Sequence, residues 1–345
     1  MKYLYLNQMI QTLPKEEINV LALEEEFFSR PFYFSYSGLN RLLYSPKLFY
    51  SHYVLQQKEE KTDSHLIEGK VIHCLLLESE KFDEQFVVSP VSLPGDNAKL
   101  VVDKVYQYAV ETNSLDQDLR SFEQVILDVL KGINLHQSLK TDEQRVEKMV
   151  TDQTVGYFDF LKQKGKKDII DTDTYYKCLD SVQILRQNPE VVEALDLNRD
   201  SGATVYSEYP IQIELPGYPF GLKGIVDNIV VDENNKTVII NDVKTTGKTV
   251  AEFAETVEYY NYWLQAAVYK KLVIGEIAKG ADWKVKFNFI VIDKYKQTYV
   301  FPVSDETLNK WYLTGLSNAL TKAKYHFEKR DFSLPYDMLQ SKVVL

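Results

Sequence analysis

The chain has 345 residues, of which 45% are hydrophobic and 26% are charged. This is the composition of an ordinary globular protein with room for one large domain or two small ones. The formal net charge of −10 argues against a surface coated in basic nucleic-acid-binding patches, although a locally positive channel on an acidic body is compatible with it.

The sequence indicates neither a membrane-spanning segment nor a disulfide framework. No hydrophobic run approaches the roughly 18 residues that a spanning helix needs, and residues 1–7 are too short and too polar to begin a signal peptide. Cys74 and Cys178 lie far apart, and two cysteines exclude a four-cysteine iron–sulfur or zinc site. We therefore expect a cytoplasmic protein that does not contact membranes.

The chain begins with a predicted lead-in over residues 1–34, which contains a short helix. Ser35 or Ser37 is a natural N-cap for the next short helix, because serine hydroxyls accept hydrogen bonds from the first turn. Pro46 is expected to end or bend that helix.

An apolar helix is predicted to begin within residues 68–78, and it contains His73. A buried histidine satisfied by a hydrogen bond is the alternative to a role in a site. Residues 82–90 are predicted to be a strand or an extended segment. Residues 96–170 are predicted to be a long, mainly helical insertion with charges between its apolar faces.

A strand is predicted over residues 204–213, and it carries Glu208. It precedes a predicted hairpin, so its acid is expected to lie close to that hairpin. Glu214 follows on the same stretch and competes with Glu208 as the third acid.

The hairpin consists of residues 224–230 and 239–246, joined by a polar turn over residues 232–236. Acids are unusual in such hydrophobic strands, yet Asp227 interrupts the first strand and Asp242 lies near the end of the second. Facing residues of a hairpin lie within roughly 5 Å of each other. The two carboxylates can therefore meet across it.

Lys244 lies two residues beyond Asp242, so both side chains leave the same face of their strand. Two carboxylates and an ammonium group at a sheet edge can hold Mg²⁺ or Mn²⁺ and orient a water for attack on phosphorus. The alternative is a solvated strand end with alternating charges, because a triplet of this kind is short and common.

Residues 251–274 are predicted to form one helix closed by Gly275. Gln265 and Tyr269 share a face of that helix, because they are four residues apart. The last predicted elements are two hairpin strands, an amphipathic helix capped by Asp305, and a tail, over residues 286–292, 297–302, 305–329 and 331–345.

Five motifs follow one another along residues 35–275. They are Ser35-x-Ser37-x-Leu39-Asn40-x-Leu42, Gly69-x-x-x-His73-Cys74-x-x-Leu77-Glu78, Asp227 in its apolar strand, Asp242-Val243-Lys244-Thr245-Thr246 and Tyr260-x-Tyr262-x-x-Gln265-x-x-x-Tyr269. This order resembles the PD-(D/E)XK nuclease superfamily in its RecB-like branch, and most of all the PDDEXK-like domain of RecE, exodeoxyribonuclease VIII. The resemblance implies an α/β, restriction-endonuclease-like core over residues 35–330, with a central mixed sheet flanked by helices.

The resemblance also implies roles for particular residues. It implies that two divalent ions are held by the side chains of Asp227, Asp242, Glu208 and His73 and by the carbonyl of Val243. Lys244 is expected to orient and polarise the attacking water and to neutralise charge that develops on phosphorus. Three residues are expected to position the substrate strand, namely Gln265, Tyr269 and Thr245.

The function implied by the resemblance is that of a Mg²⁺- or Mn²⁺-dependent deoxyribonuclease, a 5′→3′ exonuclease on linear duplex DNA ends in recombination or replication. The implied partners are DNA, a single-strand annealing protein and further copies of the chain in a ring. The alternatives are an endonuclease, a CRISPR-associated type of RecB-like nuclease without an iron–sulfur cluster, and a catalytically idle scaffold that binds DNA ends.

Overall fold

The computed structural model describes five stretches of the chain, residues 15–57, 64–89, 93–165, 167–280 and 282–341. The first 14 residues of the predicted lead-in and the last four of the predicted tail lie outside the described residues. The chain divides into two compact units. The first comprises Met1–Thr62 and Ile184–Leu345, and the second comprises Asp63–Gln183.

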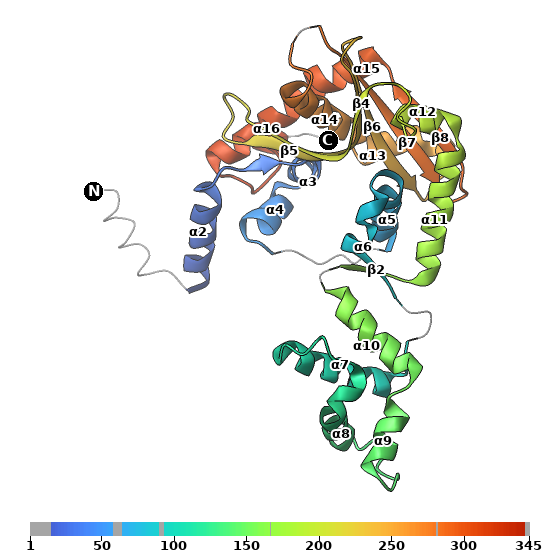
Figure 1. Ribbon diagram of the computed structural model, residues 1–345. Helices are drawn as coiled ribbons and strands as arrows, with labels where there is room; N and C mark the ends of the chain where they lie inside the picture. The colour runs from blue at the N-terminus through green and yellow to red at the C-terminus, as the bar shows by residue number, and fades with distance from the viewer. Residues whose placement is uncertain (1–14, 58–63, 90–92, 166, 281, 342–345) are drawn as a thin grey trace. The chain divides into compact units, whose positions relative to one another are not determined.

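The first unit is built on a six-stranded mixed sheet, as the sequence predicts (Figure 1). Its strands are β1 (Tyr33–Phe34), β4 (Thr204–Ile213), β5 (Gly221–Asp232), β6 (Thr237–Thr246), β7 (Lys284–Asp293) and β8 (Thr298–Val303). The order is β1-β5-β6-β7-β8, and β4 also pairs with β5. The pairs β1–β5 and β6–β7 are parallel, and the others are antiparallel.

Helices flank this sheet, which confirms the predicted α/β class. They are α2 (Lys15–Phe28), α3 (Tyr36–Tyr44), α4 (Pro46–Phe49), α12 (Pro189–Leu195), α13 (Phe253–Tyr259), α14 (Tyr262–Glu276), α15 (Asp305–Lys310), α16 (Ser317–Lys329) and α17 (Tyr336–Gln340). π-helical segments over Tyr50–Val54 and Trp311–Leu316 continue α4 and link α15 to α16. Among the described residues, no helix is both long enough and apolar enough to cross a membrane.

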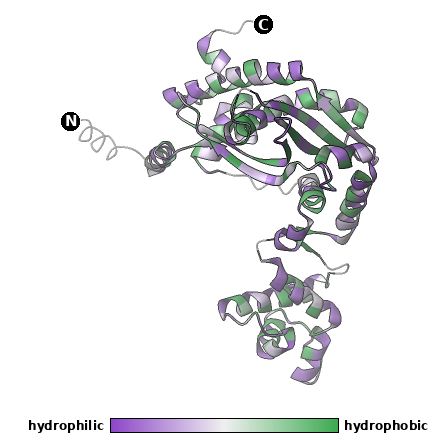
Figure 2. Ribbon diagram, turned by 45° about the horizontal axis from the view of Figure 1, so that its top comes forward, coloured by the Kyte–Doolittle hydropathy of each residue, from purple (hydrophilic) through white to green (hydrophobic). Residues whose placement is uncertain are grey.

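One face of the sheet packs against α14 through a continuous apolar core. Ile240 of β6 and Phe287 of β7 are fully buried there, together with Leu264 and Leu272 of α14. The strands are accordingly mostly green in Figure 2. Burying side chains of this size stabilises the fold by about 1.5–3 kcal/mol each, so the core fixes α14 on this face of the sheet.

The other face of the sheet carries asparagines under α12. The Asn241 amide donates to Asn228 Oδ1 and to the Ala194 carbonyl, both at 2.7 Å, and Asn288 donates to Asn241 Oδ1 at 2.8 Å. Asn228 in turn donates to the Leu195 carbonyl at 3.1 Å. These bonds satisfy buried amides and join α12 to the sheet.

The predicted helix over residues 251–274 is not continuous, and this prediction was wrong. A 3₁₀ turn over Val250–Glu252 leads into α13, which ends at Tyr259. The next helix, α14, starts at Tyr262. Asn261 lies between them in the left-handed conformation, with φ of 56°. Asparagine tolerates that conformation better than most residues, because its side chain bonds locally.

The other helix signals are confirmed in part. Ser35 caps α3 and accepts from the Gly38 amide, and α3 ends at Tyr44, so the helix breaks before Pro46 as predicted and Pro46 begins α4. The last long helix is capped by Ser304, which accepts from the Thr307 amide, and not by Asp305. Asp305 instead occupies the first turn, where its charge favours the helix dipole.

The second unit is mainly helical. It contains α5 (Ser64–Leu77), α6 (Phe82–Gln85), β2 (Phe86–Val88), α7 (Asp96–Glu111), α8 (Glu123–Gly132), α9 (Asp142–Met149), α10 (Asp152–Lys164), β3 (Asp168–Ile170) and most of α11 (Thr172–Gln187), with 3₁₀ turns over Ser79–Lys81 and Leu119–Phe122. β2 and β3 form a small parallel pair. The segment predicted as extended over residues 82–90 is therefore part helix and part strand.

Candidate active site

Strands β5 and β6 separate at the two acids that the sequence singles out. They pair from Asp232 with Thr237 as far as Asn228 with Asn241. From there β6 stays with β7 up to Thr246, and β5 stays with β4. We call the point of separation, where Asp227 and Asp242 follow the last pair, the fork.

A side chain holds the fork in place of a backbone pair. Asp227 Oδ2 accepts a hydrogen bond of 2.8 Å from the backbone amide of Val243. The carboxylate thus binds a donor that the diverging β5 backbone no longer meets. A buried backbone N–H needs such a partner, so Asp227 has a structural role here as well as a candidate chemical one.

Each oxygen of Asp242 is held by a different side chain. Asp242 is fully buried. Its Oδ2 forms an ion pair of 2.6 Å with Lys244 Nζ, and its Oδ1 accepts a hydrogen bond of 2.8 Å from Gln265 Nε2. Charge-assisted bonds of this kind fix the orientation of the carboxylate.

Lys244 is a largely buried cation between acids and an aromatic ring. Its Nζ lies 4.8 Å from the centre of the Tyr262 ring, over its face. Burial alone lowers the pKa of Lys244, but the charges of Asp242 and Asp227 outweigh it and leave the pKa above its ordinary value. The group is therefore an ammonium, a donor of hydrogen bonds and not an acceptor.

Glu208 is the third acid at the fork. Ser207 pairs with Asn228 and Tyr209 with Val226, which places Glu208 opposite Asp227. One carboxylate oxygen of each lies within 4.8 Å of the other. Glu208 also has a φ of 43°, which is rare for a residue other than glycine within a strand. Strain of this kind clusters at functional sites.

The strained residue marks a change in the side-chain alternation of β5. Leu222 and Val226 face the α14 core before Asp227, but Ile229 and Val231 face it afterwards. The side-chain alternation of the strand, which has a period of two, therefore changes phase at Asp227. The change brings Asp227 to the side of the sheet on which Asp242 lies.

Glu214, the competing acid, lies elsewhere. It follows the end of β4, and its Oε1 accepts a hydrogen bond from the hydroxyl of Tyr33. The geometry thus favours Glu208 as the acid of the fork.

Gln265 and Tyr269 of α14 lie over the acids. Gln265 Nε2 also donates to the Tyr269 hydroxyl at 3.1 Å. Burial raises the pKa of Tyr269 well above its usual value, and the charges of Asp227, Asp242 and Glu208 raise it further. One phenol therefore lies close to all three acids. Across the described residues, no donor reaches the buried Oε1 of Gln265.

Thr245 is a predicted site residue whose side chain the fold does not direct to the fork. Thr245 alternates with Lys244 along β6, so its side chain is directed to the opposite face from Asp242 and Lys244. His73 lies on α5 in the second unit. The roles of both residues stay predictions.

Sequence reasoning gave no role to Tyr36 and Tyr262, which border the site. Burial raises the pKa of both phenols, and Asp242 raises each of them further. The sequence contains part of the information needed to find Tyr262, because this residue lies one helical turn before Gln265 and so shares its face of the helix. The contribution of Tyr36 from α3 depends on long-range packing.

The sequence of residues 33–310 matches the family model described as the PD-(D/E)XK nuclease superfamily. The chain belongs to this superfamily. No curated protein matches it. Solved structures that resemble it include a "Putative exonuclease" from Eubacterium rectale, with 12% identity, 97% of this chain and 94% of that chain covered, and a TM-score of 0.44. Another is SSO0001, with 12% identity, coverage of 79% and 89%, and a TM-score of 0.26.

PD-(D/E)XK nucleases use divalent metal ions, and the fork suits such an ion. Its ligands would be carboxylate oxygens, the hard donors that Mg²⁺ and Mn²⁺ prefer. Two oxygens on one Mg²⁺ lie at most about 4.2 Å apart. An oxygen of Asp227 and one of Glu208 lie within 4.8 Å of each other, which is close to that spacing.

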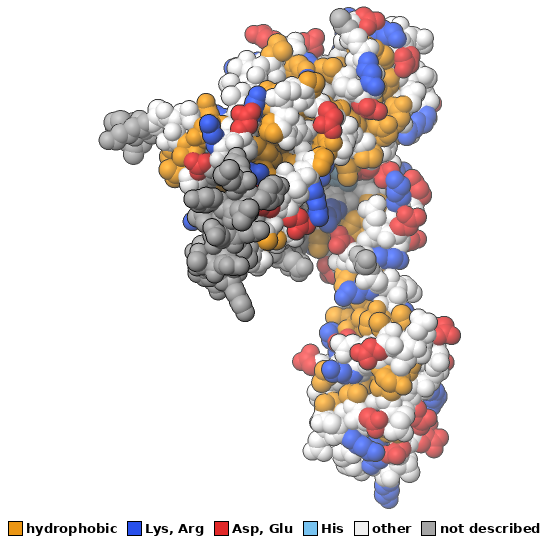
Figure 3. Space-filling view, turned by 90° about the vertical axis from the view of Figure 1, so that its left-hand side faces the viewer, with side chains coloured by type: hydrophobic (Ala, Val, Ile, Leu, Met, Phe, Trp, Pro, Cys, Tyr) orange, Lys and Arg blue, Asp and Glu red, His pale blue; other side chains and the backbone are white. Residues whose placement is uncertain are grey.

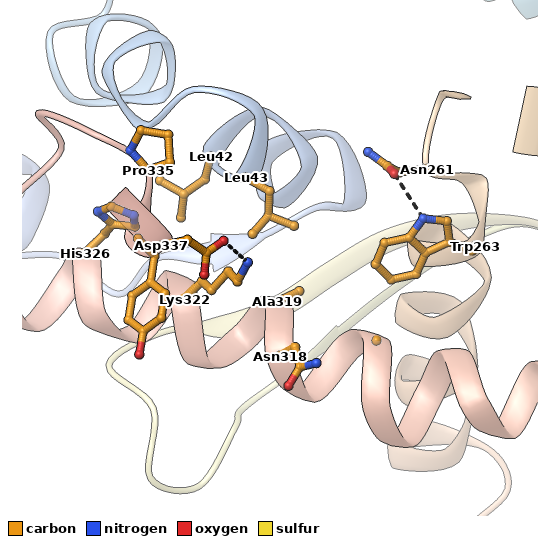
Figure 4. A pocket seen from close by; sticks show the side chains of 12 residues that line it. Leu42, Leu43, Asn261, Trp263, Asn318, Ala319, Lys322, His326, Pro335 and Asp337 are labelled. Atoms are coloured by element: carbon orange, nitrogen blue, oxygen red, sulfur yellow. Dashed lines mark hydrogen bonds and ion pairs between the residues drawn. The ribbon is translucent and has the colours of Figure 1, made fainter. Parts of the chain in front are cut away.

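A separate pocket of the nuclease domain contains different residues. It encloses about 280 Å³ and is lined by Leu42, Leu43, Trp263 and neighbours (Figure 4). Lys322 and Asp337 form an ion pair of 2.5 Å in its wall. None of the predicted site residues belongs to the described lining, so we do not place the chemistry there.

Proposed function

We propose that this chain is a metal-dependent deoxyribonuclease that degrades linear duplex DNA from its 5′ ends. The observation that supports the proposal most is the fork, where Asp242 contacts both Lys244 and Gln265, and Asp227 and Glu208 oppose each other. Like charges gathered in a buried place are unfavourable unless a cation joins them. A nuclease of this superfamily has that cation.

Asp227, Asp242 and Glu208 would hold one or two Mg²⁺ or Mn²⁺ ions, and His73 and the Val243 carbonyl are further proposed ligands. A bound ion of this kind lowers the pKa of water and stabilises negative charge on phosphoryl oxygens. The hydrogen bond from Val243 N keeps Asp227 directed across the fork. Gln265 does the same for Asp242.

Lys244 supplies a fixed positive charge next to the acids. Its ammonium is held by Asp242 and by the Tyr262 ring, so it needs little rearrangement when charge develops on phosphorus. Preorganised charge in a buried site is commonly the largest contribution to catalysis. We propose that Lys244 orients the attacking water and neutralises the phosphorane.

The finer parts of the proposal extend the family assignment. The RecE-like order of the motifs supports exonuclease action in recombination or replication, and with it a single-strand annealing partner and a ring of several copies. Gln265, Tyr269 and Thr245 are the proposed contacts to the substrate strand.

The test uses the purified full chain with end-labelled linear duplex and closed circular DNA, in Mg²⁺, Mn²⁺ or EDTA. We expect the linear DNA to be shortened from its 5′ ends only with metal, and the circle to stay intact. Nicked circles would favour an endonuclease. Binding without cleavage in every metal would favour an idle scaffold.

Two variants connect this activity to the fork. Asp242→Asn and Lys244→Met each keep the side-chain size but remove the charge, so each is expected to lower the cleavage rate by roughly 10²- to 10³-fold. Lys236→Met, in the turn that precedes β6, is the matched control and should cleave normally. Circular dichroism checks the fold, and full activity in both fork variants would refute the site.

A further inference from the structure

The turn between α13 and α14 presents two adjacent tyrosines to solvent. Tyr259 is 76% exposed and Tyr260 is 50% exposed. Their ring centres lie 4.8 Å apart with the ring planes at 90°. An exposed side chain of this size contributes little to the core, so Tyr259 is free to contact a ligand.

The backbone of this turn is fixed from three sides. The Tyr260 carbonyl accepts hydrogen bonds from Tyr36 Oη at 2.5 Å and from Asn40 Nδ2 at 3.4 Å. Asn261 donates to Asn40 Oδ1 at 2.8 Å and accepts from Trp263 Nε1 at 3.0 Å, as the dashed line in Figure 4 shows. The exposed rings therefore project from a preorganised turn, which lowers the entropy lost when a ligand binds.

The two rings are continuous with the fork. Tyr260 stacks on Tyr262, with ring centres 5.6 Å apart and planes at 27°. The Tyr262 ring also contacts Lys244, whose Nζ lies 4.8 Å from the ring centre, and Lys244 pairs with Asp242. A contiguous series of side chains thus leads from solvent at Tyr259 to the candidate catalytic acids.

Charge alone gives this acidic chain little attraction for a polyanion. On the face drawn in Figure 3, acidic and basic side chains are interspersed and do not form one basic field. Stacking of bases on aromatic rings does not depend on net charge, and it tolerates any base sequence. An exposed aromatic beside the fork therefore supplies affinity that electrostatics does not.

We propose that Tyr259 stacks against the base of an unpaired nucleotide in the strand bound at the fork. Tyr260 is a positioning residue, because its ring contacts both the Tyr259 ring and the Tyr262 ring. This inference rests on the proposed nuclease function and adds a nucleobase subsite to it. The subsite serves a strand whose bases have left the duplex, as at a frayed or single-stranded end.

The experiment uses the full chain and a single-stranded DNA oligonucleotide that carries one 2-aminopurine near its 5′ end, in Ca²⁺. Stacking should quench the 2-aminopurine fluorescence on binding. Tyr259→Ala should lose the quench and raise Kd by roughly 5- to 150-fold, and Tyr259→Trp should restore both. Tyr299→Ala is the matched control, because Tyr299 is an exposed tyrosine too, at 50%, but lies on the edge strand β8.

Cleavage in Mg²⁺ separates this inference from the proposed function. If the wild type cleaves DNA, Tyr259→Ala should raise KM by the same factor, with the smaller effect on kcat. If the wild type cleaves DNA, but Tyr259→Ala binds the oligonucleotide and quenches its fluorescence as the wild type does, the subsite is refuted and the nuclease stands. Quenching that depends on Tyr259 without any cleavage would support the subsite and refute the nuclease. If the wild type cleaves duplex DNA but does not bind the oligonucleotide, the subsite is refuted and the nuclease stands.

Discussion

At the scale of single residues, the orientation of Asp242 depends on two partners of opposite character. Lys244 holds one oxygen by charge, and Gln265 holds the other by a neutral donor. The Gln265 side chain is itself buried and contacts Tyr269. The amide therefore determines where the second oxygen of Asp242 points.

Gln265→Leu should remove this restraint while filling nearly the same volume. A hydrogen bond to a charged group contributes about 1.5–3 kcal/mol, so kcat/KM for DNA cleavage should fall by roughly 10- to 100-fold. Tyr269→Phe, which keeps the donor to Asp242, is the control and should lose less. Steady-state kinetics on linear duplex DNA measure both. A Gln265→Leu enzyme within twofold of the wild type would contradict this role.

The sequence predicts the local part of the site well. Asp227, Asp242 and Lys244 belong to one hairpin, whose register follows from its turn and from the period of its strands. The conformation of Glu208 is not predictable in this way, because its positive φ depends on pairing with β5. The side-chain alternation of β4 and of β5 changes phase at Glu208 and Asp227, and the hydrophobic pattern of one strand alone does not reveal this.

At the scale of elements, the break between α13 and α14 depends on Asn261. This residue combines a φ of 56° with hydrogen bonds to Asn40 and from Trp263. A continuous helix would direct Tyr259 and Tyr260 along the helix surface and would lose those bonds. Sequence periodicity missed the break because apolar residues continue through it.

Asn261→Ala should lose both the hydrogen bonds and the tolerance of positive φ, and should destabilise the fold by about 2–4 kcal/mol. Asn261→Gly loses the bonds but accepts the conformation, so it should cost about 1–2 kcal/mol. Urea unfolding compares the two variants. Equal losses would show that the backbone conformation is not a source of the difference.

At the scale of the whole molecule, the acid stability of the first unit depends partly on His326. Its Nδ1 donates to the Asp331 carbonyl at 2.5 Å, and its side chain is buried among aromatic rings. Burial lowers the pKa of His326 below its ordinary value near 6.5, and Asp331 opposes this only in part. The folded protein therefore keeps this imidazole neutral.

This shift fixes the sign of the pH dependence. Well above pH 6.5 the histidine is neutral in both the folded and the unfolded state, so it adds no pH dependence to the free energy of unfolding. As the pH falls below that value, the unfolded chain binds a proton that the folded chain does not, so the free energy of unfolding decreases. His326→Asn, which retains a donor for Asp331, should show a smaller decrease between pH 6.5 and 5 in urea unfolding. Identical slopes would contradict this assignment.

The α/β class and the central hairpins were predictable because hydrophobic periodicity encodes them directly. The sequence gives less guidance on assembly. α3 contributes Tyr36 and Asn40 to the turn that precedes α14, over 200 residues away, and no local pattern announces these bonds. Long-range contacts of this kind are set by packing of the whole first unit.

The central claim is that the acids of the fork bind a divalent cation. Calorimetric titration of the full chain with Mn²⁺ tests it most directly, with wild type, Asp227→Asn and Asp242→Asn, and with Asp232→Asn at the far end of the hairpin as control. We predict that the wild type and the control bind one or two ions, and that each fork variant binds at least about tenfold more weakly. Equal Mn²⁺ affinity in all four proteins, or none in the wild type, would contradict the claim.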